Sequence, residues 1–193
     1  MKIVLASQSP RRRELLGRLG LNFTIKTSQL DESAFTAPTP QDLVQCLSRE
    51  KALSVAREEP PDTLVLGADT VVVLDGQTLG KPSGPEQARA MLRRLSGRTH
   101  EVCTGLTLCR GEEILTQAEH TLVTFRPLDE GEIAAYVRSG EPLDKAGAYG
   151  IQALGSLFVS GISGDYSNVV GLPLCRLGKM LKHFGVDCLS PWR

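Results

Sequence analysis

The sequence predicts an α/β fold with a mixed β-sheet, and three observations carry that prediction. Helical and strand-like patterns alternate in the first half of the chain, as they do where helices connect parallel strands. Two long β-branched segments in the middle are joined by a short turn, which indicates an antiparallel hairpin. A chain of 193 residues, 41% hydrophobic and 23% charged, fits one globular domain spanning residues 1–193.

Local signals predict the first elements. A short apolar run over residues 2–6 is bounded by polar residues and indicates a buried strand. Ser9 followed by Pro10 is typical of an N-cap and a first helical position, and Gly20 ends that helix.

The same kinds of signal predict the other elements. Runs of β-branched and apolar residues predict strands at residues 22–26, 63–74, 99–109, 113–125 and 157–162. Caps, prolines and apolar periodicity predict helices at residues 40–59, 85–95, 129–138 and 172–184. A glycine-rich loop is expected at 139–155 and a turn at 163–165. The long hairpin strands indicate an elongated sheet with a groove between two lobes.

Charge and cysteine content argue against several classes of protein. Lys plus Arg and Asp plus Glu each number 22, so the net charge of zero disfavours a general binder of nucleic acids or membranes. Five cysteines without CxxC spacing disfavour a disulfide framework or a zinc site. Cys46, Cys103 and Cys175 lie among apolar residues and are expected in the core. The sequence shows no signal-peptide pattern and no membrane-spanning run, so we expect a cytoplasmic protein.

The segment from Ser7 to Arg13 predicts an anion site. It follows a strand and opens a helix, where backbone N–H groups and the helix dipole attract phosphate. Arg11 and Arg12 can each donate a pair of hydrogen bonds to phosphate oxygens. The alternative is a solvated basic first turn, but cations oppose the helix dipole there, which favours a bound anion.

Asp69 and Lys51 are charged residues in apolar surroundings. Asp69 interrupts the run LVLGADTVVVL, where a carboxylate is costly to bury unless it is paired or binds a metal. At the end of a buried strand it suits a metal ligand or a general base, while a turn at residues 67–70 is the alternative. Lys51 falls on the apolar stripe of its helix, and the alternative is that its stem only snorkels to water.

Further polar residues complete a candidate site for a triphosphate and a metal. Lys81 and the acidic pair Asp31-Glu32 add a cation and carboxylates, and magnesium prefers carboxylates together with phosphates and water. Hydrolysis of a phosphoanhydride needs cations, a metal and a base for water. Gln152 in the glycine-rich loop can hydrogen-bond a base edge, although such loops are commonly only turns. The three histidines lack metal or triad spacing, and P-loop and GxSxG motifs are absent from the sequence.

Six sequence blocks in a fixed order closely resemble the Maf-like nucleotide pyrophosphatases. They read SQSPRR, REKA, GADT, GKP, DKAGAYGIQ and VGLP, at residues 7–12, 49–52, 67–70, 80–82, 144–152 and 170–173. The resemblance covers residues 2–184. It implies an elongated α/β fold with a central cleft between two lobes, related to the inosine triphosphate pyrophosphatases and often dimeric.

The resemblance also implies a reaction and a role for each residue. It implies cleavage of a nucleoside triphosphate between its α and β phosphates, with magnesium or manganese as cofactor. Asp69 would accept the proton of the attacking water and, with Glu32, bind the metal. The residues that would hold the phosphates are Ser7, Arg11, Arg12, Lys51 and Lys81, of which the two lysines belong to the catalytic set.

Three positions match the branch of the family that acts on dTTP and UTP, namely Arg12, Thr70 and Gln152. The 7-methyl-GTP branch has Trp before the arginine, Gln after the aspartate and Glu in the glycine-rich loop. Modified pyrimidine nucleotides are further candidate substrates in a house-cleaning role. The alternative of another class is a nucleotide-binding regulator of cell division, which need not retain a base. We expect a homodimer that binds a nucleoside triphosphate and neither nucleic acid nor membrane.

Overall fold

The structure is a computed structural model that describes residues 1–190, so the last three residues of the predicted domain lie outside it. The strands are β1 Ile3–Leu5, β2 Thr24–Ile25, β3 Leu64–Leu74, β4 Gln77–Leu79, β5 Thr99–Arg110, β6 Glu113–Phe125 and β7 Val159–Ser163. The α-helices are α1 Pro10–Gly17, α2 Pro40–Ala56, α3 Pro85–Leu95, α4 Glu130–Arg138, α5 Tyr166–Val170 and α6 Leu174–His183. Short 3-10 helices are η1 Glu32–Ala34, η2 Glu141–Asp144, η3 Ala146–Ala148 and η4 Leu154–Phe158.

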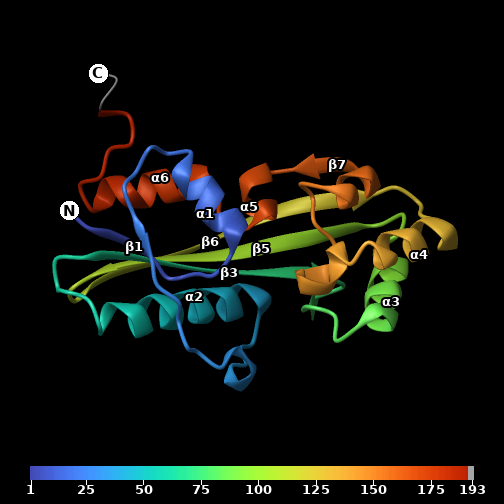
Figure 1. Cartoon of the computed structure of the whole chain (residues 1–193), viewed down its shortest axis with the longest axis horizontal. Coiled ribbons are helices and arrows are strands. Elements are labelled where there is room, and N and C mark those ends of the chain that lie inside the picture. The colour runs from blue at the N-terminus through green and yellow to red at the C-terminus, as the bar shows by residue number, and fades with distance from the viewer. Residues whose placement is uncertain (191–193) are drawn as a thin grey trace.

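The sheet is mixed, as the sequence predicts. Within residues 1–190 it has seven strands, in the order β2-β1-β3-β5-β6-β7, with β4 paired to β3. β1 runs parallel to β2 and β3, and the other pairs are antiparallel. The long strands β3, β5 and β6 run along the molecule and give it an elongated shape (Figure 1).

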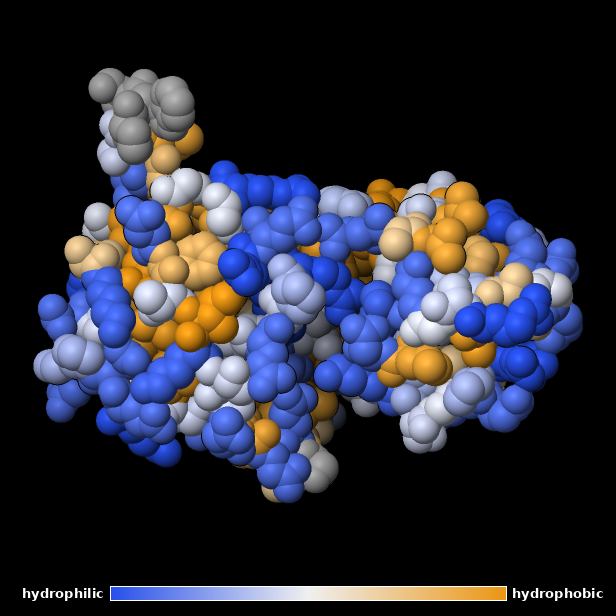
Figure 2. Space-filling model, in the orientation of Figure 1, coloured by the Kyte–Doolittle hydropathy of each residue, from blue (hydrophilic) through white to orange (hydrophobic). Residues whose placement is uncertain are grey.

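Helices cover both faces of the sheet. α2 lies on one face against β3 and β5, while α1, α5 and α6 lie on the other, and α3 and α4 pack together at the far end (Figure 1). The visible face is mixed: hydrophilic residues lie between apolar groups on the half that holds the termini and apolar groups over the β7 end (Figure 2). Leu154 and Leu157 are among the exposed apolar residues of this segment. No helix within residues 1–190 is long and apolar enough to cross a membrane.

Two glycines let α2 approach the sheet closely. A Cβ added at Gly67 of β3 would collide with the backbone oxygen of Ser48, and one at Gly105 of β5 with that of Val44. Both of these backbone oxygens belong to α2, so the backbone of this helix packs directly against the two strands. This close contact sets where Lys51, on the same helix, meets the sheet.

Most of the predicted helices and strands are confirmed, and so are the predicted N-caps of α1 and α2. Ser9 caps α1 by accepting a hydrogen bond from the backbone N–H of Arg12, and Thr39 caps α2. Asp69 lies in the middle of the continuous strand β3, so the expectations of a turn or of a strand end there are both wrong. Cys103 is buried as predicted, whereas Cys46 is only partly buried and Cys175 is exposed.

The region after residue 138 differs most from the prediction. The glycine-rich segment 139–155, called the late loop below, contains η2, η3 and the start of η4. The predicted strand at 157–162 begins only at Val159. The short helix α5 follows the turn at 163–165 and was not predicted, and Gly171 in the left-handed region ends it before α6.

Candidate functional site

The predicted site residues gather at a gap in the pairing of one edge of β3. β1 pairs with this edge as far as Leu66, and β4 pairs with it from Val72 onward. Within the part of the chain that the structure describes, no strand pairs with residues 67–71 on that side. Asp69 and Thr70 lie in this gap and point to opposite faces of the sheet, since side chains alternate along a strand.

On the α2 face, Lys51 brings two carboxylates together. Its Nζ lies 2.6 Å from Asp69 Oδ1 and 2.7 Å from Glu32 Oε1. The Lys51 and Asp69 side chains are only 11% and 9% exposed, while Glu32 is 52% exposed. A charge pair this deeply buried is compensated rather than isolated, which explains how β3 tolerates an aspartate. Lys51 is therefore an ion-pair partner and not only a snorkelling side chain.

The pKa values of the two carboxyl groups move in opposite directions. Burial raises the pKa of Asp69, and the charges of Lys51 and Arg12 only partly oppose this effect. Burial also acts to raise the pKa of Glu32, but the hydrogen bond and charge of Lys51, with Lys81 and Arg12, lower it overall. Asp69 is thus the stronger base of the two, as a proton acceptor requires.

On the opposite face, Arg12 is held by several acceptors. Its Nε donates to the carbonyl of Gly171 at 2.9 Å, its Nη2 to Thr70 Oγ1 at 3.0 Å and its Nη1 to Ser7 Oγ at 3.3 Å. Burial lowers the pKa of Arg12, while Asp69 acts to raise it. A guanidinium has five N–H groups, so these contacts fix its orientation without exhausting its donors.

Ser7 and the start of α1 complete this corner. Ser7 is 8% exposed, and its Oγ also accepts from the backbone N–H of Ser9 at 3.2 Å. Arg11 is partly buried next to Arg12. Burial acts to raise the pKa of Asp144 in the late loop, but Lys145 and, to a smaller extent, the charge of Arg11 lower it overall. The predicted anion site therefore has its cations in place beside a helix N-terminus.

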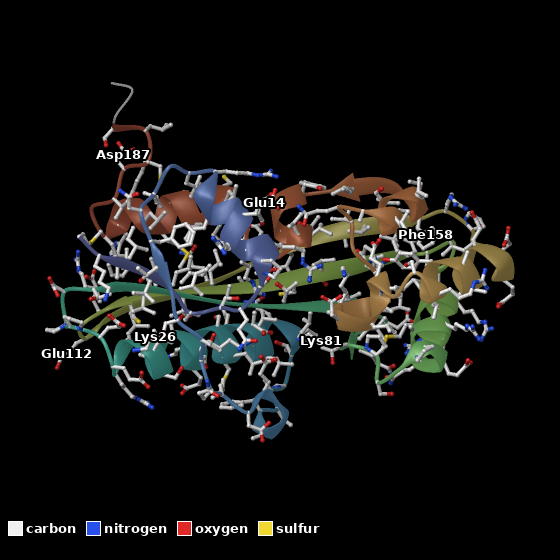
Figure 3. The ribbon with its side chains drawn as sticks, viewed as in Figure 1. Glu14, Lys26, Lys81, Glu112, Phe158 and Asp187 are labelled. Carbon is white, nitrogen blue, oxygen red and sulfur yellow. The ribbon has the colours of Figure 1, made fainter. Side chains whose placement is uncertain are left out.

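Lys81 and Gln152 lie on the other side of the gap. Lys81 is exposed in the loop after β4, beside the late loop (Figure 3), where Gly147 N–H donates to Gly80 O at 3.0 Å. Its charge acts on Glu32. Gln152 is exposed in the late loop, and no hydrogen bond joins it to the other site residues described. The structure thus brings the other predicted residues together and leaves Gln152 apart from their contacts.

Glu32 and Asp69 are the residues that could hold a magnesium ion together with a substrate. Within residues 1–190, no group of three or more His, Cys, Asp or Glu side chains is placed to hold a metal alone. Glu32 and Asp69 nevertheless converge on the same ammonium group. Two carboxylates completed by phosphate oxygens and water are the donor set that magnesium commonly uses.

Two contributors to the site were missed by the sequence reasoning. Thr104 of β5 contacts Thr70 at 2.9 Å between hydroxyl oxygens, and the Gly171 carbonyl binds Arg12. A threonine in a strand is unremarkable, so the sequence carries no signal for Thr104. Gly171 lies in the block VGLP. That block indicated that the segment matters, but not that a backbone carbonyl group in it binds Arg12.

Comparison with known proteins identifies the family of the chain. The sequence model of the family described as Maf-like protein matches residues 2–184. The chain belongs to this family. A Maf-like relative from Moorella thermoacetica, named dTTP/UTP pyrophosphatase, is 57% identical over 189 residues and covers 96% of each chain. One of the same name from Symbiobacterium thermophilum is 50% identical, over 95% of this chain and 94% of its own.

A solved structure supports the fold of this Maf-like chain independently. A HAM1 protein from Coxiella burnetii superposes with a TM-score of 0.53 at 16% identity, covering 95% of this chain and 99% of its own. At that identity the likeness concerns the fold alone. It agrees with the mixed α/β architecture, while the predicted central cleft stays a prediction.

Proposed function

We propose that this protein is a pyrophosphatase that hydrolyses dTTP and UTP to the nucleoside monophosphate and pyrophosphate. The observation that carries the proposal is the buried Asp69–Lys51 pair beside the oriented guanidinium of Arg12. The names of relatives at 57% and 50% identity support the same substrates.

In the proposed reaction, water adds to phosphorus as the anhydride bond between the α and β phosphates breaks. Asp69 accepts a proton from that water, and burial favours this role by raising the pKa of the carboxyl group. Arg11, Arg12, Lys51 and Lys81 hold the phosphates and offset the negative charge that reaches the leaving pyrophosphate. Ser7 keeps Arg12 in position through its hydroxyl group.

Glu32 and Asp69 are the residues that would hold a divalent metal, magnesium or manganese. When bound, the metal would neutralise phosphate charge and help to activate water. Lys51 contacts both carboxylates, so it keeps them close to each other before any ligand binds.

Substrate choice is proposed to depend on Thr70 and Gln152, together with Arg12. Thr70 lies in the gap of β3, and Gln152 is free at the surface to reach a base edge. Modified pyrimidine triphosphates present the same base edge and are proposed as further substrates. We also propose a homodimer in the cytoplasm. The five free thiols of the structure fit a reducing compartment, and the mass in solution tests the dimer.

The test is pyrophosphate release from a panel of nucleoside triphosphates with magnesium or manganese. We expect release from dTTP and UTP in preference to 7-methyl-GTP. Asp69→Asn should lower kcat by about 10²- to 10⁴-fold, the usual contribution of a general base. The double variant Thr70→Gln with Gln152→Glu should shift preference toward 7-methyl-GTP.

Two results would count against the proposal. Tight nucleotide binding without pyrophosphate release from any substrate would support a nucleotide-binding regulator of cell division instead. Full activity of Asp69→Asn would show that another group accepts the proton. Circular dichroism of Asp69→Asn verifies that this variant retains its fold.

A further inference from the structure

A chain of hydroxyl groups connects Arg12 to the interior of the sheet. Arg12 Nη2 lies 3.0 Å from Thr70 Oγ1, which lies 2.9 Å from Thr104 Oγ1. Thr104 Oγ1 in turn donates to the backbone carbonyl of Asn168 at 3.2 Å. Thr70 and Thr104 face each other across β3 and β5, and Thr104 is fully buried.

The two ends of this chain fix the direction of every hydrogen bond in it. A carbonyl group only accepts, so the single proton of Thr104 is directed to Asn168 O. Thr70 must then donate its own proton to Thr104. A guanidinium only donates, so the Thr70 oxygen presents a lone pair to Arg12.

The Asn168 carbonyl at the far end of the chain, and the Gly171 carbonyl that binds Arg12, belong to one anchored segment. Asn168 of α5 is fully buried, and its Nδ2 donates to Val102 O at 3.0 Å and to Thr121 Oγ1 at 2.9 Å. These contacts tie α5 to β5 and β6. Gly171, which ends α5, offers its carbonyl to Arg12 Nε. Two of the three acceptors of Arg12, the Gly171 carbonyl and Thr70, therefore depend on the same anchored segment.

We propose that Thr104 is a positioning residue, whose hydroxyl orients Thr70 so that Thr70 holds the Arg12 guanidinium ready for a phosphate. Thr104 is fully buried, so it acts on a bound phosphate only through Thr70. Preorganised donors avoid reorientation when the anion binds, which is why their loss weakens binding. The inference rests on the proposed function for its kinetic readout only.

The test compares Thr104→Val, which removes the hydroxyl at nearly constant volume, with Thr104→Ser, which retains it. We expect Thr104→Val to raise the KM for dTTP by about 3- to 12-fold, the usual effect of losing one hydrogen bond between neutral groups. The Ki of inorganic tripolyphosphate should rise by a similar factor, because the substitution weakens the binding of phosphate groups by Arg12. Thr104→Ser should stay within about 2-fold of wild type in both values, because its hydroxyl restores the bond.

Two controls separate positioning from general damage. Thr107→Val removes another fully buried hydroxyl of β5, which contacts Ser48 at 3.0 Å and Thr116 at 2.9 Å. It should leave KM unchanged, since those contacts do not lead to Arg12. In a double-mutant cycle, Thr70→Val combined with Thr104→Val should be no worse than Thr70→Val alone.

A spectroscopic readout does not need activity. The 15N signal of the Arg12 side chain, assigned by its loss in Arg12→Lys, reports exchange of its N–H protons with water. Exchange should be several-fold faster in Thr104→Val than in wild type, Thr104→Ser or Thr107→Val. A wild-type protein without pyrophosphatase activity would overturn the proposed function, and the Arg12 signal would still decide the positioning.

The inference is overturned if Thr104→Val matches wild type in KM, Ki and Arg12 exchange. It is also overturned if Thr104→Ser fails to restore them, because the hydroxyl is then not the group that matters. Additive effects of Thr70→Val and Thr104→Val would likewise show that Thr104 acts by another route.

Discussion

At the scale of single residues, neighbouring side chains of β3 serve opposite faces of the sheet. Asp69 pairs with Lys51 on the α2 face, while Thr70 holds Arg12 on the α1 face. In the proposed function, both groups act on one substrate, which they can reach only where the edge of the strand is unpaired. The gap between β1 and β4 is thus what joins the proposed base to the proposed phosphate clamp.

The sequence could reveal Asp69, but not the groups that hold Arg12 in place. Asp69 stands out because a carboxylate in an apolar strand demands compensation. Thr104 and the Gly171 carbonyl make their contribution by position alone, and their residue types are ordinary for a strand and a turn. The prediction that Cys175 lies in the core was wrong. Its neighbours in the sequence are apolar, but it lies on the exposed side of α6.

His100 carries a prediction about pH and stability. It is 2% exposed, lies 2.8 Å from the Tyr149 hydroxyl through Nε2, and packs edge-on against Phe125 with ring centroids 5.0 Å apart. Burial lowers the pKa of His100 to about 4. Because the folded-state pKa lies below the unfolded value of 6.5, the imidazole contributes stability above that value, and the contribution is lost as pH falls toward the folded-state pKa.

Between about pH 7 and about pH 4.5, the free energy of unfolding should fall by roughly 2 kcal/mol on account of His100. Urea unfolding at both pH values measures the total change, and His100→Phe should reduce that change by this amount. Phe125→Leu is the matched control, since it disturbs the same cluster and leaves the imidazole. An unchanged pH dependence in His100→Phe would contradict the prediction.

At the scale of elements, strong local signals predicted the long strands and the capped helices well. β3, β5 and β6 carry dense β-branched runs, and α1 and α2 carry cap residues followed by proline. The short helix α5 lacked such a signal. It has five residues, and its stability comes from Asn168 bonded to β5 and β6, which are distant in sequence. Helices this short depend on tertiary contacts rather than on propensity.

The contact between α2 and the sheet gives a prediction about packing. Gly105→Ala should lower the free energy of unfolding by about 2 kcal/mol or more, because its Cβ would meet the backbone of α2 and neither element can yield easily. Shifting α2 also moves Lys51 away from Asp69, so activity should fall with stability. Thermal unfolding and pyrophosphate release measure the two effects.

Gly178 in α6 is the matched control for this substitution. A Cβ there meets no atom within 4 Å, so Gly178→Ala should stabilise the protein by about 0.5–1 kcal/mol through helix propensity. Activity should stay at the wild-type value. If Gly105→Ala were as harmless as Gly178→Ala, the close approach of α2 to β5 would be refuted.

At the scale of the whole molecule, the site draws on residues from nearly the full length of the chain. Ser7 and Arg12 come from the first elements, Asp69 from the central strand, and Gly171 from the segment before α6. β1 pairs with β3, and α1 contacts α5, so elements from the first and last parts of the sequence meet at the site. A ligand that bridges these parts stabilises the folded state as a whole.

This linkage predicts that metal and nucleotide stabilise the protein together. Under the proposed function, Glu32 and Asp69 alone would be too few ligands for magnesium, and the phosphates of a substrate would complete the set. We expect magnesium alone to leave Tm nearly unchanged. A non-hydrolysable α,β-imido analogue of dTTP with magnesium, at about 100 times its Kd, should add about 2.7 kcal/mol, or about 5–10 °C in Tm.

The metal-dependent part of this shift should depend on the carboxylates. Asp69→Asn should retain stabilisation by the analogue alone, since the phosphate-holding cations remain, and should lose the further increase with magnesium. Scanning calorimetry measures the Tm shift with the analogue alone, with magnesium alone and with both together. A large shift with magnesium alone would mean that the protein holds the metal without substrate, and an equal shift with and without magnesium would mean that these carboxylates do not bind it.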